Sequence, residues 1–169
     1  MPRRPPTDRG ADEAGTILVA SDNPAAAEVI ARVLEEQGHA VKRMESDEQT
    51  LAALDETTTA VVISGLGGEE ADRSGLLGAI RENADARVGL ARVVLVADGE
   101  ADRATGWDLG ADGVLIRPFH AVELIAEVGE VLARPDEERV PYRHEQLRAA
   151  RRADTDSETP WPVGPADDD

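Results

Sequence analysis

Residues 110–119 read GADGVLIRPF, and the rest of the chain is interpreted outwards from them. Within this stretch, residues 113–116 form a short apolar run that follows a glycine-containing turn and ends just before an Arg-Pro pair. Such a run, bounded by turn residues, is typical of a buried β-strand. Residues 120–133 come next and carry apolar side chains at helical spacing. The stretch therefore predicts a strand followed directly by a helix.

The same alternation of apolar runs and helical patterns extends towards the N-terminus. The runs do not alternate with polar residues, so both faces of the strands should be covered by helices, which predicts an α/β fold with a parallel sheet. Gly38 should end the first helix, and Asp22 or Asn23 should cap it. Its inward face should carry Ala26, Val29, Ile30, Val33 and Leu34. The predicted strands are residues 16–20, 40–44, 60–64, 92–97 and 113–116, and the predicted helices are residues 24–37, 46–54, a segment around 76–80, 102–109 and 120–133.

The two ends of the chain differ from this core. Residues 1–15 and 134–169 are rich in proline and charge, which predicts a disordered N-terminal segment and a largely disordered C-terminal tail. Within the tail only a short helix around residues 144–152 is expected, with Leu147 and alanines to bury. Residues 16–133 are enough to fold as one domain.

Composition excludes several classes of function. The chain has 35 acidic and 18 basic residues and a formal net charge of −17, which argues against binding to nucleic acids or anionic membranes. It has no cysteine, so disulfides and thiolate metal sites are excluded, and its three histidines are widely scattered. It has neither an apolar run of membrane-spanning length nor a secretory signal. We expect a soluble cytoplasmic protein.

The order of the elements, the acidic turn after the first strand and residues 110–119 together resemble the receiver domain of two-component response regulators. In that family Gly-Ala-Asp precedes a fifth strand that ends in Lys-Pro-Phe, and residues 110–112 and 117–119 match these two elements closely. The resemblance covers residues 16–133. It implies a flavodoxin-like, doubly wound sheet of five parallel strands in the order 2-1-3-4-5, with five helices.

The resemblance also implies a phosphorylation site at the carboxyl ends of the strands. In the family an aspartate accepts a phosphoryl group from a histidine kinase, two acids hold Mg²⁺, and a hydroxyl and a lysine contact the phosphoryl oxygens. In this chain the phosphoacceptor position falls on Ser64, the acid pair on Ser21 and Asp22, the hydroxyl on Ala97 or Val96, and the lysine on Arg117. A serine without a base is a poor nucleophile, and one carboxylate is too little for useful Mg²⁺ affinity. We therefore expect an atypical receiver that lacks phosphotransfer and binds no cofactor.

Each of these positions also has a plain structural interpretation. Asp22 is either a residual cation ligand or a helix cap. Ser64 is either a kinase target or a small polar filler at a strand end. Arg117 either binds an anion or forms an ion pair with Asp22 or Asp98. Residues 65–68 form a glycine-rich loop without the spacing of a known phosphate-binding motif.

The leading hypothesis is a phosphorylation-independent receiver domain that acts in signal transduction through protein–protein contacts. Trp107 and Phe119 fall on the face that the family uses for partners, and Trp107 is either an anchor there or packed against the last helix. A homodimer is compatible with the family. The alternative is a sensor that binds small anions around Arg117, and phosphotransfer through Asp98 or Asp22 stays open. Enzymatic activity is not expected, because no nucleophile triad, nucleotide fingerprint or metal cluster is recognisable.

Overall fold

The computed structural model describes residues 15–21, 23–54, 58–66 and 72–158. Five parallel strands form one sheet in the order β2-β1-β3-β4-β5, as predicted. The strands are β1 (Thr16–Ser21), β2 (Ala40–Met44), β3 (Thr58–Leu66), β4 (Val93–Ala97) and β5 (Gly113–Ile116). The helices are α2 (Pro24–Glu36), α3 (Asp47–Ala53), α4 (Asp72–Arg81), α5 (Ala86–Gly89), α6 (Ala101–Leu109), α7 (Ala121–Ala133) and α8 (Asp136–Glu158).

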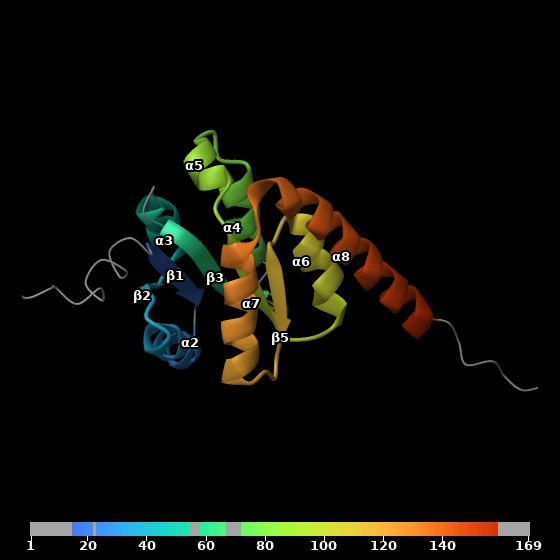
Figure 1. Cartoon of the computed structure of the whole chain (residues 1–169), viewed down its shortest axis with the longest axis horizontal. Helices are drawn as coiled ribbons and strands as arrows, with labels where there is room; N and C mark the ends of the chain where they lie inside the picture. The colour runs from blue at the N-terminus through green and yellow to red at the C-terminus, as the bar shows by residue number, and fades with distance from the viewer. Residues whose placement is uncertain (1–14, 22, 55–57, 67–71, 159–169) are drawn as a thin grey trace, which may run out of the picture.

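Helices cover both faces of the sheet (Figure 1). On one face, α2 and α7 pack on strand residues such as Ile17 and Val62. On the other face, α3, α4 and α6 pack on residues such as Leu18 and Val61. Neighbouring residues of a strand thus enter different cores, which is why the strands are apolar throughout.

Local signals set the ends of α2 as expected. The side chain of Asn23 accepts hydrogen bonds from the backbone N–H groups of Ala25 and Ala26, at 3.0 and 3.2 Å, so Asn23 supplies the cap. Gly38 ends the helix with a φ of 91°, a left-handed conformation that favours glycine.

The predicted inward face of α2 is partly wrong. Val29 is 62% exposed, whereas Ile30 is 2% exposed and Leu34 is 1% exposed. The buried stripe is completed by Ala27 and Ala31. At 3.6 residues per turn, Val29 falls on the side opposite this stripe, and the small alanines let the helix approach the sheet closely.

The expected disordered tail is wrong for residues 136–158. They form α8, a helix that contains the short helix expected around residues 144–152. Its buried positions include Arg139 and Ala150, so the face that packs on the domain is built partly from arginine, which a search for apolar periodicity misses. Together with α5, α8 extends the predicted set of helices. The predicted disorder of residues 1–14 and 159–169 lies outside the described residues.

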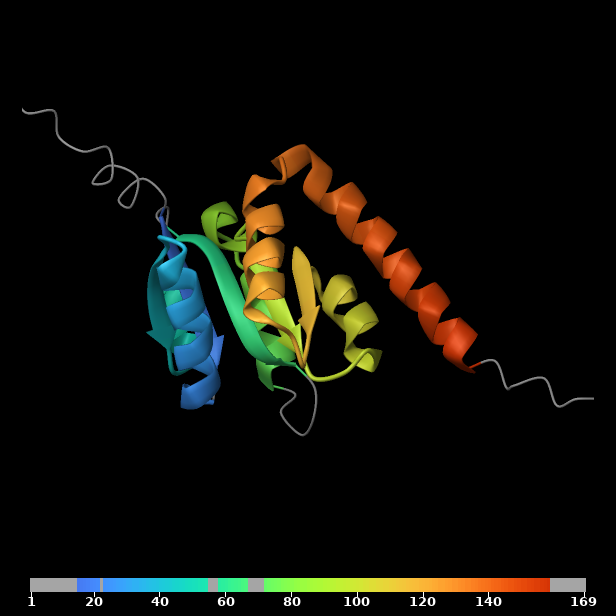
Figure 2. The ribbon, with the colours of Figure 1, turned by 60° about the horizontal axis from the view of Figure 1, so that its bottom comes forward.

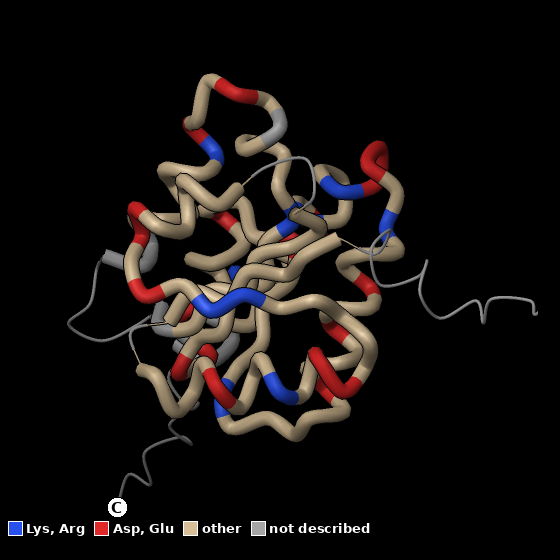
Figure 3. The backbone as a smooth tube through the Cα atoms, turned by 90° about the vertical axis from the view of Figure 1, so that its left-hand side faces the viewer, with Lys and Arg blue, Asp and Glu red and all other residues tan. Residues whose placement is uncertain are grey.

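The surface is strongly charged. Acidic positions are spread around the outer elements and are interrupted by basic ones (Figure 3). In the part of the chain that the structure describes, no helix combines the length and the apolar character needed to cross a membrane.

Candidate functional site at the strand ends

Parallel pairing gathers the predicted site residues at one edge of the sheet. Ser21 at the end of β1 lies opposite Ser64 of β3, and Ser64 lies opposite Val96 of β4. Ala97 lies opposite Ile116, the last residue of β5, so Arg117 follows at the same edge. The carboxyl ends of parallel strands are where open α/β sheets place their binding sites.

Arg117 is the centre of this edge. One of its guanidinium nitrogens donates a hydrogen bond to the Ser64 hydroxyl, and another lies 3.2 Å from the carboxylate of Asp98. The Ser64 side chain is buried, while those of Arg117 and Asp98 are 34% and 55% exposed. Of the two interpretations of Arg117, the ion pair with Asp98 is the one that the structure contains.

The remaining predicted positions offer little chemistry. The Ser21 hydroxyl is engaged locally, because it accepts a hydrogen bond from the backbone N–H of Asn23 at 3.1 Å. Val96 and Ala97 are buried and have no hydroxyl, and the Ala97 carbonyl accepts the backbone N–H of Arg117 at 2.9 Å. Asp22 and residues 67–68 of the glycine-rich loop lie outside the described residues. In the described residues, no three His, Asp or Glu side chains are grouped so that they could hold a metal ion.

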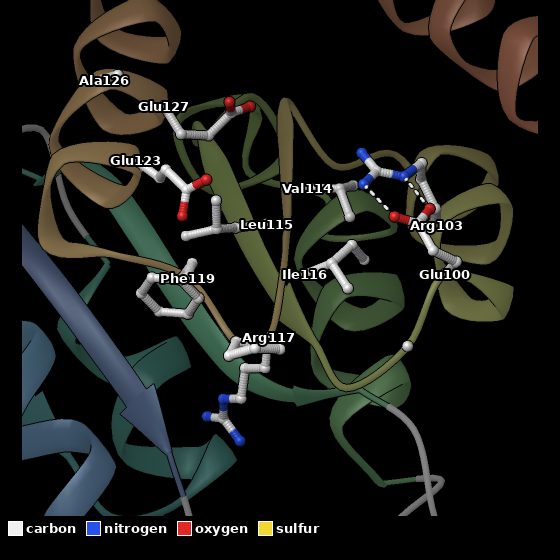
Figure 4. A pocket seen from close by; sticks show the side chains of 12 residues that line it. Glu100, Arg103, Val114, Leu115, Ile116, Arg117, Phe119, Glu123, Ala126 and Glu127 are labelled. Atoms are coloured by element: carbon white, nitrogen blue, oxygen red, sulfur yellow. Dashed lines mark hydrogen bonds and ion pairs between the residues drawn. The ribbon is translucent and has the colours of Figure 1, made fainter.

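A groove adjoins this edge, between α6 and α7 and over β5. It encloses about 690 Å³, and its apolar lining includes Leu115, Ile116 and Phe119. Figure 4 shows Glu123 and Glu127 along its α7 side and the paired Glu100 and Arg103 on its α6 side. The guanidinium of Arg117 points out of the groove, towards the end of β1 (Figure 4). The backbone and the aliphatic part of the Arg117 side chain therefore line the groove, whereas its guanidinium group lies in the strand-end site.

Glu127 gives the groove a half-buried carboxyl group. Burial and the nearby charge of Glu130 raise its pKa above the ordinary value. The charges of Arg134 and Arg103 and a hydrogen bond from the backbone N–H of Val114 act in the opposite direction and favour the ionised form.

Of the two interpretations of Trp107, packing against a helix is the one that the structure contains. Its side chain is 3% exposed because α8 covers α6. The ring of Tyr142 in α8 meets Trp107 edge to face, with centroids 5.9 Å apart. The prediction that Trp107 packs against a helix is confirmed, but the helix is α8 and not the one predicted over residues 120–133. Phe119 is partly buried and does line the groove.

Known proteins share this architecture. The receiver domain of NtrX from Brucella abortus matches with a TM-score of 0.61 and 24% identity, over 70% of this chain and 99% of that chain. The receiver domain of a signal transduction histidine kinase from Syntrophus aciditrophicus matches with a TM-score of 0.59 and 25% identity, over 71% of this chain and 91% of that chain. This chain has the fold of a response-regulator receiver domain.

Sequence comparison agrees with the receiver fold. YvrH, a transcriptional regulatory protein of Bacillus subtilis, is 29% identical, with 72% of this chain and 51% of that protein covered. The chain spans about half the length of the curated relatives it matches, at 45% and 51%. No family model matches the chain.

A second polar centre, at the opposite edge of the sheet, was not predicted. Asp112 is 3% exposed and accepts hydrogen bonds from three arginines. Arg81 of α4 lies at 2.8 Å, and Arg139 and Arg143 of α8 lie at 2.8 and 3.2 Å. The backbone N–H of Val93 donates to the same carboxylate at 2.9 Å.

This centre has more positive than negative charge. Burial would raise the pKa of Asp112, but the hydrogen bond from Arg139 and the charge of Arg81 outweigh it and hold the pKa below its ordinary value. Burial lowers the pKa of Arg81 to about 10, so Arg81 stays charged at neutral pH. Backbone carbonyls, including those of Gly110 and Ala91, accept the remaining guanidinium N–H groups. Arg139 and Arg143 are four residues apart and therefore lie on one face of α8, from which both reach Asp112.

Proposed function

We propose that this receiver domain works in signal transduction without aspartyl phosphorylation, as a binding module for another protein and not as an enzyme. The observation that carries the proposal is the position of Arg117. Its guanidinium donates a hydrogen bond to Ser64, which stands at the position where a phosphorylated receiver needs an acceptor carboxylate. The same guanidinium forms an ion pair with Asp98, so a positive side chain occupies the place of a bound cation.

The chemistry of the strand ends supports this proposal. A serine hydroxyl needs a base beside it to act as a nucleophile, whereas the Ser64 hydroxyl faces a guanidinium. The described side chains do not suit Mg²⁺, which prefers several carboxylate and water oxygens. Asp98 is already paired, and the charge of Arg117 would repel a second cation.

The groove between α6 and α7 supports the choice of a protein partner. It joins an apolar floor to an acidic side, and the net charge of −17 disfavours nucleic acid as a direct ligand. The relatives are described as a regulatory protein and as receiver domains, and we extend a signalling role from them to this chain. The anion-sensing alternative is less well supported, because an anion would have to displace both partners of Arg117.

An NMR titration of the whole chain with Mg²⁺ and then beryllofluoride, a phosphoryl mimic, tests the proposal. The amides of Ser64, Asp98 and Arg117 should show no saturable shifts at millimolar Mg²⁺, and beryllofluoride should not change this. The double variant Ser64→Asp/Arg117→Lys restores two positions of the family pattern and serves as the positive control. Saturable shifts in the wild-type chain that spread into α6 would overturn the proposal.

A further inference from the structure

The helix α8 covers the outer face of α6 with few apolar side chains. Figures 1 and 2 show α6 lying between β5 and α8. The apolar contacts come from Tyr142, which meets Trp107, from Ala150, which is 7% exposed, and from the partly buried Leu147. Much of the remaining surface of α8 is exposed and charged, so little apolar area holds it in place.

The polar contacts of α8 gather near its N-terminal end, where Asp136 pairs with Arg92 at 3.0 Å and Arg143 donates to the Ala111 carbonyl at 3.0 Å. Arg139 and Arg143 both bind Asp112, and Arg139 also donates to the carbonyl of Leu90 at 2.9 Å. A weaker ion pair joins Arg151 to Asp108 at 3.4 Å, with both side chains more than 60% exposed. All of these contacts except the last lie towards the N-terminal end of α8, and the rest of the helix packs on α6 through Tyr142, Leu147 and Ala150.

The covered surface also contains an unfavourable feature. The indole N–H of Trp107 is buried and has no hydrogen-bond partner within the described part of the chain. A buried donor without a partner has a free-energy cost that contact with water would relieve. Elements with few buried apolar contacts are those that open locally while the remaining fold persists.

We propose that α8 is a removable cover of α6, and that the surface beneath it binds an amphipathic helix of a partner protein. This inference rests on the proposed function, because it names a partner surface for the same module. Release of α8 would expose Trp107 and free Asp112 from two of its three arginines. The partner would compete with α8 for both.

The partner's chemistry is read from α8 itself. A matching helix needs an aromatic residue at the place of Tyr142 and a small residue eight positions later, at the place of Ala150. It also needs an arginine three positions before the aromatic residue, where Arg139 reaches Asp112. Binding through an apolar stripe flanked by charge is a common mode of helix recognition. The acidic chain favours a basic partner.

Two neighbouring alanines of α8 provide a matched test in the whole chain. Ala150 is buried against the domain and Ala149 is exposed. Ala150→Glu should push α8 off α6, and Ala149→Glu should leave it in place. Hydrogen exchange of the α6 amides should become at least ~10-fold faster in Ala150→Glu alone, while the amides of β1, β3 and β4 keep their protection.

A labelled peptide of residues 134–158 then probes the uncovered surface. It should bind Ala150→Glu saturably in fluorescence anisotropy and fail to bind wild type or Ala149→Glu. The same peptide with Arg139→Gln should bind at least ~10-fold more weakly, because it lacks the bond to Asp112. A dimer of Ala150→Glu in light scattering would assign the surface to a second copy and overturn the choice of a partner protein.

Other outcomes also decide the matter. If α6 and the sheet lose protection together in Ala150→Glu, α8 is an inseparable part of the fold and the inference is wrong. If α6 stays protected and the peptide does not bind, no cover has been removed and the inference is equally wrong. A beryllofluoride response in the earlier titration would overturn the proposed function but leave these results unchanged, so the two failures are distinguishable.

Discussion

Arg117 is a single residue whose replacement should affect the strand ends in two ways. Its ion pair with Asp98 is partly exposed and contributes little, whereas its hydrogen bond to the buried Ser64 satisfies a hydroxyl that has no other partner among the described residues. The second contact should dominate the energetic effect.

Arg117→Ala should therefore lower the free energy of unfolding by about 1–2 kcal/mol, mainly through Ser64. Arg103→Ala is the matched control, because the Arg103–Glu100 pair is similarly exposed and involves no buried hydroxyl. Its effect should be below about 0.5 kcal/mol. Urea denaturation of both variants checks the difference, and equal losses would contradict the role assigned to Ser64.

Asp112 is the residue on which the opposite edge depends. Asp112→Asn would leave three guanidinium groups without their carboxylate in a largely buried place, and we expect a loss of about 3 kcal/mol or more. Asp108→Asn removes an exposed pair with Arg151 and should cost less than about 0.5 kcal/mol. Similar midpoints for the two variants in urea would show that the Asp112 cluster contributes no more to stability than an exposed ion pair.

At the scale of elements, α2 shows how packing selects a helix face. Val29 and Ile30 are adjacent apolar residues, yet only Ile30 enters the core beneath the sheet. The face of α2 that contacts the sheet is therefore narrower than the apolar face that the sequence predicts.

This difference is directly testable. Ile30→Ala should lower the free energy of unfolding by about 2–4 kcal/mol, because it removes a buried side chain and leaves a cavity. Val29→Ala should change it by less than about 0.5 kcal/mol, since alanine favours the helix and the valine is exposed. Thermal unfolding followed by circular dichroism distinguishes them, and a large loss for Val29→Ala would place it at a buried interface.

At the scale of the whole molecule, the stability of the fold should depend on pH through the ionisation of Asp112. Burial raises the pKa of Asp112, but the hydrogen bond from Arg139 and the charge of Arg81 lower it by more, so the folded pKa lies below the ordinary value of 3.8. The facing groups are Arg81 from α4 and Arg139 and Arg143 from α8. These arginines keep their charge at low pH.

A carboxylate with a lowered pKa stabilises the fold above the unfolded pKa and loses this effect as pH falls through the folded pKa. The difference in unfolding free energy between wild type and Asp112→Asn should stay constant from about pH 7 to pH 5. It should shrink below about pH 4. Chemical denaturation across this range measures it, and a difference that grows in acid would contradict the lowered pKa.

Much of the fold was predictable from local patterns. The strands at residues 40–44 and 113–116 were predicted with their observed bounds, because short apolar runs between turn residues leave few alternatives. Caps and stops such as Asn23 and Gly38 act within a few residues, so they too are visible in the sequence. The strand order followed from the resemblance that residues 110–119 carry.

Side-chain partners far apart in the chain were decided by the tertiary structure alone. The ion pair of Arg117 with Asp98 was one of several open alternatives, and its hydrogen bond to Ser64 was not predicted, because only the parallel strands bring these residues to one edge. The burial of Trp107 and the bonds from α8 to Asp112 join segments about 30 residues apart. A helix held by arginines has no strong apolar periodicity, so only its packing against α6 distinguishes it from a charged tail.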